Sequence, residues 1–217
     1  MLKKSNVSTV IRLPASEIPR AGEVLAKGFF YDPIVLYMFP DESKRAQLMP
    51  WHFIAFVRYG YLFGEVYSTA GKTDGVAVWL PPGEVQMPPE HIEQAGLDRA
   101  SEVLGREPWE RFTSIMSYLE HFHRQDVQPR HWYLALIGID PSQQGHGLGG
   151  ALLKPMLARA DAEGLPCYLE TVESKNVPFY QKHGFKIITE SIEPQSGIRF
   201  WTFRHDPRGR EETKTAA

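Results

Sequence analysis

One glycine-rich stretch, residues 144–149 (Gln-Gly-His-Gly-Leu-Gly), constrains the fold of this chain more than any other part of its sequence. It follows an apolar run at residues 133–139 and precedes a segment in which apolar residues recur at helical spacing from Leu148. Glycines let a backbone approach a ligand closely, and the first turn of a helix offers unpaired N–H groups with partial positive charge. The stretch therefore predicts a phosphate-binding loop between a strand and a helix.

Two common phosphate loops do not fit this stretch. A Walker A loop ends in Lys-Ser or Lys-Thr, and neither pair follows Gly149 or Gly150. Read from Gly147, the stretch lacks the third glycine of a dinucleotide-binding turn, since Leu152 stands at that position, and the stretch falls late in the chain. What remains is a Gln-x-x-Gly-x-Gly loop after a strand that ends at Asp140-Pro141.

Composition and charge narrow the class of protein. The 217 residues are 42% hydrophobic and 23% charged, which is typical of a globular domain with a substantial core. A net charge of −2 argues against a broad nucleic-acid-binding face, and a single cysteine, Cys167, indicates a reducing compartment. Because the N-terminus lacks an apolar signal core and no run reaches about 18 apolar residues, we expect a soluble, cytoplasmic protein.

Hydrophobic periodicity predicts a mixed α/β chain. We expect a helix after Ser16, its N-cap, that stops before Asp32-Pro33. Further helices are expected at 43–60, 88–105, 108–124, from 148 to before Gly164, and at 177–183. Strands are expected at 8–13, 62–68, 75–80, 131–139, 167–172, 185–190 and 197–204. Pro50 should kink or split its helix, and Pro155 should cost about 3 kcal/mol unless a kink absorbs it.

The order of these segments predicts their arrangement. Residues 62–80 should form an antiparallel hairpin with a turn at residues 73–75, and 131–139 should be a central strand covered on both faces. The segment 131–172 should be a right-handed crossover unit. A single domain is expected over residues 1–205, followed by a flexible tail at 206–217.

Two segments together resemble the GCN5-related N-acetyltransferase (GNAT) family. The first is residues 136–141 with the glycine loop, and the second is residues 176–185, which match the family's Asn…Tyr-x-x-x-Gly-Phe pattern. Within the family, residues 132–185 are most similar to puromycin N-acetyltransferase and its relatives. The resemblance implies the GNAT fold, a central mixed and mostly antiparallel sheet of six to seven strands flanked by helices. It also implies that acetyl-CoA binds to the half of the domain at about 130–204.

The resemblance assigns roles in acetyl-CoA binding. Backbone groups near Gly138 would bind the pantetheine arm where the strand splays from its neighbour, and N–H groups of the glycine loop would cradle the pyrophosphate. Asn176 would hold the pantetheine or adenine side and also cap the last helix, whereas His146 would either touch phosphate or point to solvent. The implied set is Ile137, Gly138, Ile139, Gln144, Gly145, His146, Gly147, Leu148, Gly149, Gly150 and Asn176.

Tyr180 is the residue that the resemblance places at the chemistry. A coenzyme thiol has a pKa of roughly 8.5 and an ordinary tyrosine one near 10, so Tyr180 can protonate the leaving sulfur as a general acid. The N–H of Ile139 would polarise the thioester carbonyl. Glu170 is our choice as general base, with His131, Tyr133 or a water relay as alternatives, because an alkylamine must lose a proton before it attacks.

The sequence thus predicts an acetyl-CoA-dependent N-acetyltransferase that acts by direct attack on a primary amine, with a small-molecule acceptor and neither nucleic acid nor membrane as partner. A protein or peptide acetyltransferase and a non-catalytic acyl-CoA sensor stay open, as does a homodimer. No metal is expected, because the spacing of Glu120, His121, His123 and His131 matches no helix-borne His-x-x-x-His site. Trp79 and Trp109 either line an acceptor pocket or belong to the core.

Overall fold

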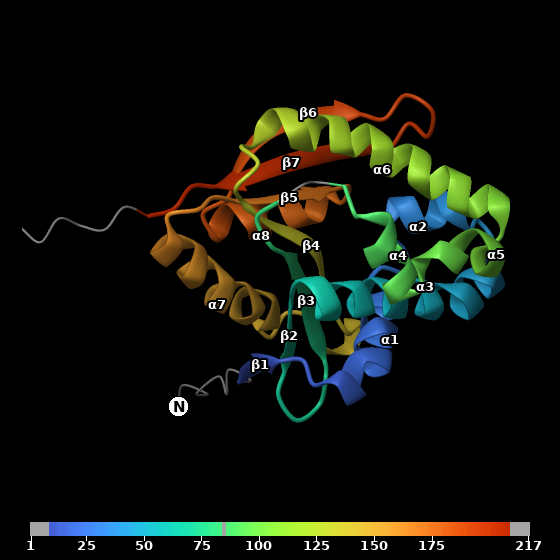
Figure 1. The fold of residues 1–217 in the computed structure, drawn as a ribbon, viewed down its shortest axis with the longest axis horizontal. Helices are drawn as coiled ribbons and strands as arrows, with labels where there is room; N and C mark the ends of the chain where they lie inside the picture. The colour runs from blue at the N-terminus through green and yellow to red at the C-terminus, as the bar shows by residue number, and fades with distance from the viewer. Residues whose placement is uncertain (1–8, 84–85, 209–217) are drawn as a thin grey trace, which may run out of the picture.

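A seven-stranded sheet runs through the centre of the protein, with helices on both of its faces (Figure 1). The computed structural model describes residues 9–83 and 86–208. The strand order is β1-β2-β3-β4-β5-β7-β6, and every neighbouring pair is antiparallel except β4 and β5. The strands are β1 Val10–Arg12, β2 Glu65–Thr69, β3 Gly75–Leu80, β4 Trp132–Ile139, β5 Cys167–Thr171, β6 Lys186–Ile192 and β7 Arg199–His205. The mixed, mostly antiparallel sheet of six to seven strands is confirmed.

The two faces of the sheet carry different helices. The helices are α1 Ile18–Gly28, α2 Pro33–Met38, α3 Glu42–Phe63, α4 Pro89–Ala95, α5 Ala100–Leu104, α6 Arg106–Asp126, α7 Leu148–Glu163 and α8 Val177–Lys182. In Figure 1, α1 and α3 lie on one side of β3 and β4, α7 lies on the other, and α6 crosses β7.

Alternation along the central strands builds one hydrophobic core on each face. Val78 of β3 packs in the core with α1 and α3, whereas its neighbour Trp79 packs in the core with α7. β4 contributes Leu136 to the first core and Leu134 to the second, although they are two residues apart, because the register of β4 against β3 shifts between them. The prediction that this strand is covered on both faces is therefore confirmed.

Prolines inside two helices do not interrupt them. α3 runs through Pro50 and α7 runs through Pro155, so the expected split of the helix at residues 43–60 is wrong. In α3, close packing offsets the lost hydrogen bond, since a Cβ on Gly22 of α1 would lie 2.6 Å from the backbone nitrogen of Ile54.

Several predicted boundaries in the first half are wrong. The first helix does stop before Asp32-Pro33, at Gly28, but a helix that was not expected begins there, because the Asp32 carboxylate accepts a hydrogen bond of 2.9 Å from the N–H of Ile34 and caps α2. Ser16 is not an N-cap: it lies in a 3-10 turn, Ala15–Glu17, before α1. The single helix expected at 88–105 breaks at Gly96, which has a φ of 77° and ends α4.

Other boundaries differ less. The strand expected at 62–68 begins at Glu65, because α3 continues to Phe63 and Gly64 then makes the turn. Of the tail expected at 206–217, residues 206–208 are outside helices and strands, and the remainder lies outside the described residues, as does the first residue of the strand expected at 8–13.

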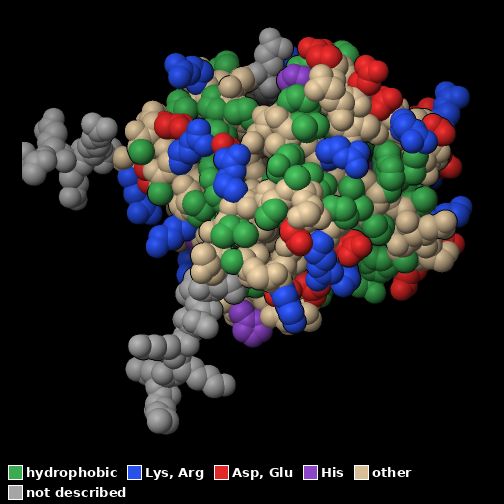
Figure 2. Space-filling view, turned by 60° about the horizontal axis from the view of Figure 1, so that its bottom comes forward, with side chains coloured by type: hydrophobic (Ala, Val, Ile, Leu, Met, Phe, Trp, Pro, Cys, Tyr) green, Lys and Arg blue, Asp and Glu red, His purple; other side chains and the backbone are tan. Residues whose placement is uncertain are grey.

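The surface in Figure 2 intersperses basic and acidic side chains with apolar ones. Among the residues that the structure describes, no helix is both long enough and apolar enough to cross a membrane.

Candidate active site

β4 and β5 pair only where they begin. Trp132 pairs with Cys167 and Tyr133 with Tyr168, and within the described strands the pairing stops there, although β4 continues to Ile139. On its other edge, β4 stays paired with β3 as far as Ile139. The strands therefore separate, and β4 backbone groups beyond Tyr133 face an opening instead of a neighbouring strand. We refer to this separation as the splay.

A bulge in β4 lies at the start of the splay. The register between β3 and β4 shifts between Val78 and Trp79, which oppose Leu136 and Leu134, so Ala135 is the extra residue. The bulge changes which side of the sheet later residues face. As a result, Ile137 and Ile139 pack on the α7 side, and Gly138 faces α1, where a Cβ would lie 2.8 Å from Leu25.

The glycine loop occupies the predicted position between β4 and α7. Gly145 and Gly147 have φ values of 81° and 80°, which only glycine adopts readily, and α7 begins at Leu148 as expected. A Cβ on either glycine would meet nothing within 4 Å, so the loop backbone faces open space. His146 is exposed, and its Nδ1 lies 3.1 Å from the carbonyl oxygen of Gln143. The N-terminus of α7 thus presents its free N–H groups to whatever occupies that space.

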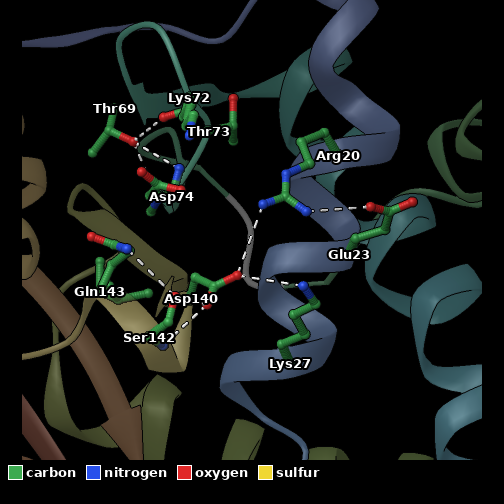
Figure 3. Close-up of polar contacts among 12 residues, drawn as sticks. Arg20, Glu23, Lys27, Thr69, Lys72, Thr73, Asp74, Asp140, Ser142 and Gln143 are labelled. Carbon is green, nitrogen blue, oxygen red and sulfur yellow. Dashed lines mark hydrogen bonds and ion pairs between the residues drawn. The ribbon is translucent and has the colours of Figure 1, made fainter.

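Asp140 fixes the end of β4 from which this loop departs (Figure 3). One carboxylate oxygen accepts hydrogen bonds from the Ser142 N–H and hydroxyl at 3.1 and 2.8 Å. The other lies 3.5 Å from Lys27 Nζ and 3.8 Å from Arg20 Nη2, both on α1. The hydrogen bonds from Ser142, aided by Lys27, lower the pKa of Asp140. Asp140 therefore ties the loop to the helix on the opposite face.

Tyr180 points into the core beside the splay. It lies on α8, is 5% exposed, and packs against the ring of Phe203 at a centroid distance of 5.5 Å. Burial raises its pKa, and the charge of Asp32 adds to that effect. The hydroxyl is therefore protonated at neutral pH, as a general acid requires.

Asn176 stands at the N-cap position of α8, but its side chain makes no capping hydrogen bond, so that part of its predicted role is wrong. Instead, its Nδ2 donates to Thr171 Oγ1 at 3.5 Å, at the end of β5. The side chain therefore ties α8 to the rim of the splay.

Asp32 is a candidate site residue that the sequence did not reveal. It is half-buried at the start of α2, and burial raises its pKa to about 7, with the nearby charge of Glu173 adding to the shift. Its charge also reaches Tyr180. A strongly shifted carboxyl beside a tyrosine is typical of a functional site. The Asp-Pro pair indicates a helix start, but nothing in the sequence places it next to α8.

The three proposed bases lie together in a buried cluster between α6 and the sheet. Glu170 keeps 8% of its side chain exposed, and burial raises its pKa to about 8, although a hydrogen bond from Tyr133 opposes that shift. His123 of α6 joins them: its Nδ1 lies 3.4 Å from Glu170 Oε1, and its Nε2 lies 2.8 Å from Nε2 of His131. The sequence reading named His123 only as a metal ligand to be rejected.

The other residues considered as metal ligands or as the lining of an acceptor pocket lie outside this cluster. Glu120 pairs with Arg124, and His121 contacts Gln125 on the exposed face of α6. Over residues 9–83 and 86–208, no group of three His, Cys, Asp or Glu side chains is arranged to hold a metal ion. Trp79 and Trp109 pack in hydrophobic cores.

A basic hollow of about 270 Å³ lies behind the glycine loop. It is lined by residues of α7, α8 and the chain after β7: Gly150, Lys154, Leu157, Asp161, Lys182, His183 and Arg208. A Cβ on Gly150 would lie 2.6 Å from His183 Nε2, so the two helices touch here. Their cations provide positive charge next to the loop.

Comparison with known proteins agrees with this arrangement. Residues 79–185, which run from β3 to the end of α8, match the sequence model of the acetyltransferase (GNAT) family. An uncharacterized N-acetyltransferase of Schizosaccharomyces pombe is 28% identical over 180 residues, which span 80% of this chain and 72% of that protein.

Solved structures share the fold at low identity. One, of histone acetyltransferase HPA2 and related acetyltransferase from Corynebacterium glutamicum, has a TM-score of 0.67 at 20% identity, with 94% of this chain and 99% of that chain covered. The Drosophila melanogaster polyamine N-acetyltransferase has a TM-score of 0.59 at 16% identity, with 91% and 99% covered. Family match, relative and fold agree that residues 79–185 form the acetyltransferase (GNAT) region of this chain, and N-acetyltransferases of that family use acetyl-CoA.

Proposed function

We propose that this protein transfers the acetyl group of acetyl-CoA directly to a primary amine of a small molecule. The observation that carries the proposal is the splay of β4 from β5, because the chain continues from the end of β4 into the glycine loop and from the end of β5 into α8, which carries Tyr180. The splay can therefore hold a thioester next to a proton donor.

Backbone groups of the protein would make most of the contacts that hold acetyl-CoA. Loop N–H groups from Gly145 to Gly150 fit a pyrophosphate, since the positive-φ glycines leave the space in front of them open. Free β4 groups at residues 137–139 would bind the pantetheine amides, and the basic hollow would receive the ribose phosphate. Gln144 and Asn176 brace the two ends: the Gln144 amide donates to the Ile139 carbonyl at 3.3 Å, and Asn176 binds Thr171.

A general acid and a general base would then complete the chemistry. Tyr180 donates its proton to the sulfur as the carbon–sulfur bond breaks, and its raised pKa means that the hydroxyl is protonated before that step. Glu170 removes the proton that the amine loses as the carbon–nitrogen bond forms, with Tyr133 fixing its carboxylate. The N–H of Ile139 would polarise the thioester carbonyl.

Asp32 indicates which chemical class of acceptor would bind. A half-buried carboxyl beside the acid would attract a cationic amine and hold it against the thioester. Structural neighbours include a polyamine N-acetyltransferase and an agmatine N-acetyltransferase, so diamines and agmatine belong in a test set. Aminoacyl nucleosides belong there too, because of the resemblance to puromycin N-acetyltransferase.

The experiment is release of free thiol from acetyl-CoA with a panel of small amines and peptides. We expect turnover with small cationic amines, and a fall in kcat of about 10²- to 10⁴-fold in Tyr180→Phe, because a general acid is worth that much. Tyr61→Phe, at an exposed tyrosine of α3, is the matched control and should retain activity.

Other outcomes would contradict the proposal. Undiminished turnover in Tyr180→Phe would show that Tyr180 is not the general acid. Faster turnover with peptides than with any small amine would show that the protein is a peptide acetyltransferase. Acetyl-CoA binding by calorimetry without acetylation of any amine or peptide makes it a sensor.

A further inference from the structure

A continuous chain of hydrogen-bonding groups leads from Glu170 to the protein surface. It passes from Glu170 Oε1 to His123 Nδ1 at 3.4 Å, and from His123 Nε2 to His131 Nε2 at 2.8 Å. It ends with His131 Nδ1, which lies 2.5 Å from the carbonyl oxygen of the exposed residue Gln128. Both histidines are almost fully buried, at 3% and 4% exposure, so neither exchanges protons freely with solvent except through this chain.

The carbonyl at the end of the chain fixes where each proton sits. Only an N–H can bond to the Gln128 carbonyl, so neutral His131 carries its proton on Nδ1 and has a lone pair on Nε2. The proton between the histidines therefore belongs to His123 Nε2, which leaves a lone pair on His123 Nδ1 facing Glu170. In the uncharged chain, Glu170 must be a carboxylic acid, and the lone pair of His123 Nδ1 that can take its proton lies 3.4 Å from Glu170 Oε1. A buried acid with a raised pKa agrees with this pattern.

From this geometry, we propose that His123 and His131 form a proton relay that converts Glu170 to a carboxylate and carries the acceptor's proton to the surface near Gln128. The proposal rests on the proposed function, in which Glu170 is the base. His123 and His131 act through Glu170 and touch neither substrate, so they are positioning residues.

Each step of the relay transfers a proton and nothing else. Glu170 gives its proton to His123 Nδ1 while His123 passes its Nε2 proton to His131, which produces a carboxylate and a cationic His131. The carboxylate then takes one proton from the attacking amine. His131 releases its Nδ1 proton to water beside Gln128. His123 is then protonated on Nδ1 and His131 on Nε2, and return of these protons to His123 Nε2 and His131 Nδ1 restores the resting pattern. Each turnover moves one proton from the amine to solvent, and nothing is oxidised or reduced.

Groups from every neighbouring element set the proton affinity of the relay. Tyr133 of β4 and Tyr168 of β5 face Glu170, and the ring of Tyr168 stacks on His123 at a centroid distance of 4.2 Å. Asp126 of α6, held by hydroxyls of β6 and β7, raises the pKa of Glu170 by its charge, and Arg124 lowers that of His123. Burial lowers the pKa of both histidines, to about 3 for His123, but in His131 the hydrogen bond to the Gln128 carbonyl opposes that shift, so a cation is stored on His131 in preference to His123.

The test is the protonation state of Glu170, followed by infrared spectroscopy of the whole protein against pH. The carboxylic-acid band that Glu170→Gln removes should be present at neutral pH and disappear with a midpoint near 8. His131→Gln keeps an acceptor for His123 but cannot carry a proton. In this variant the midpoint should rise by about one pH unit, which corresponds to tenfold less carboxylate at neutral pH.

Activity gives the second readout. The alkaline-rising limb of kcat with an alkylamine should shift upward in His131→Gln by the same amount, with the high-pH plateau kept. His121→Gln, on the exposed face of the same helix, is the matched control and should shift neither curve. An unshifted infrared midpoint in a folded His131→Gln protein would overturn the relay.

The two readouts separate the relay from the proposed function. A shifted infrared midpoint in a protein that acetylates no amine would support the proton chain and refute Glu170 as the base of an acetyltransferase. A uniform loss of kcat at every pH, without a shift of either curve, would make His131 a structural residue and overturn the relay alone.

Discussion

The proposed donor side and the proposed acceptor side of the splay are built by different means. The donor side is one continuous segment, in which two positive-φ glycines and a helix N-terminus present backbone groups. The acceptor side consists of single side chains from distant elements: Asp32 from α2, His123 from α6 and Glu170 from β5. A backbone site depends on local geometry, whereas a side-chain site depends on the whole fold and can change one residue at a time.

Distorting the donor loop should have the largest effect. Gly147→Val places a β-branched residue at a φ of 80°, which is strongly disfavoured and would move the loop amides. Loss of about two charge-assisted hydrogen bonds should weaken acetyl-CoA binding by about 100-fold, measured by calorimetry.

Gly71 offers a matched control for that substitution. Its φ is also 80° and a Cβ would meet nothing within 4 Å, but it lies in the turn after β2. Gly71→Val should bear similar strain and bind acetyl-CoA normally. Equal weakening in both variants would show that the donor site does not depend on the loop in particular.

On the acceptor side, Asp32→Asn should have a smaller and more selective effect. Asparagine still caps α2, so the fold is kept, but the charge beside Tyr180 is lost. We expect KM for a cationic amine to rise about tenfold, the value of one charge-assisted hydrogen bond, while acetyl-CoA affinity stays unchanged. Asp41→Asn makes the same change at the N-cap of α3 and should leave both unaltered. A rise in KM for acetyl-CoA alone would assign Asp32 to the donor side.

Removing single cations of the basic hollow should have the smallest effect. Lys154→Ala or Lys182→Ala should weaken acetyl-CoA binding by about threefold, because exposed ion pairs contribute little. The difference from wild type should vanish at high salt, where screening removes it. Lys44→Ala, at an exposed lysine of α3, is the control. A salt-independent loss would mean that these side chains pack the hollow instead of charging it.

The same contrast explains what the sequence could predict. The loop, the boundary at Leu148, the strands around it and the mixed sheet could all be read, because they depend on glycine geometry and on hydrophobic periods within about 40 residues. Tyr180 was found through a motif at a fixed distance from the loop. These features are local, and local rules describe them.

The acceptor side could be predicted only in fragments. Asp32 and Pro33 were read as a helix stop, since the sequence does not show that α2 follows at once or that the charge of Asp32 reaches Tyr180 of α8. His123 was considered only as a metal ligand, and its burial depends on how α6 lies over β5 and β7. Glu170 was proposed from its strand, but its shifted pKa arises from burial that only the assembled fold provides.

A structure of the protein with bound coenzyme A tests the central claim most directly. We predict the pyrophosphate on the amides of residues 145–150, the pantetheine along residues 137–139 within the splay, and the sulfur within hydrogen-bonding distance of the Tyr180 hydroxyl. A coenzyme whose pyrophosphate lies away from the glycine loop, or whose sulfur lies outside the splay, would contradict the account.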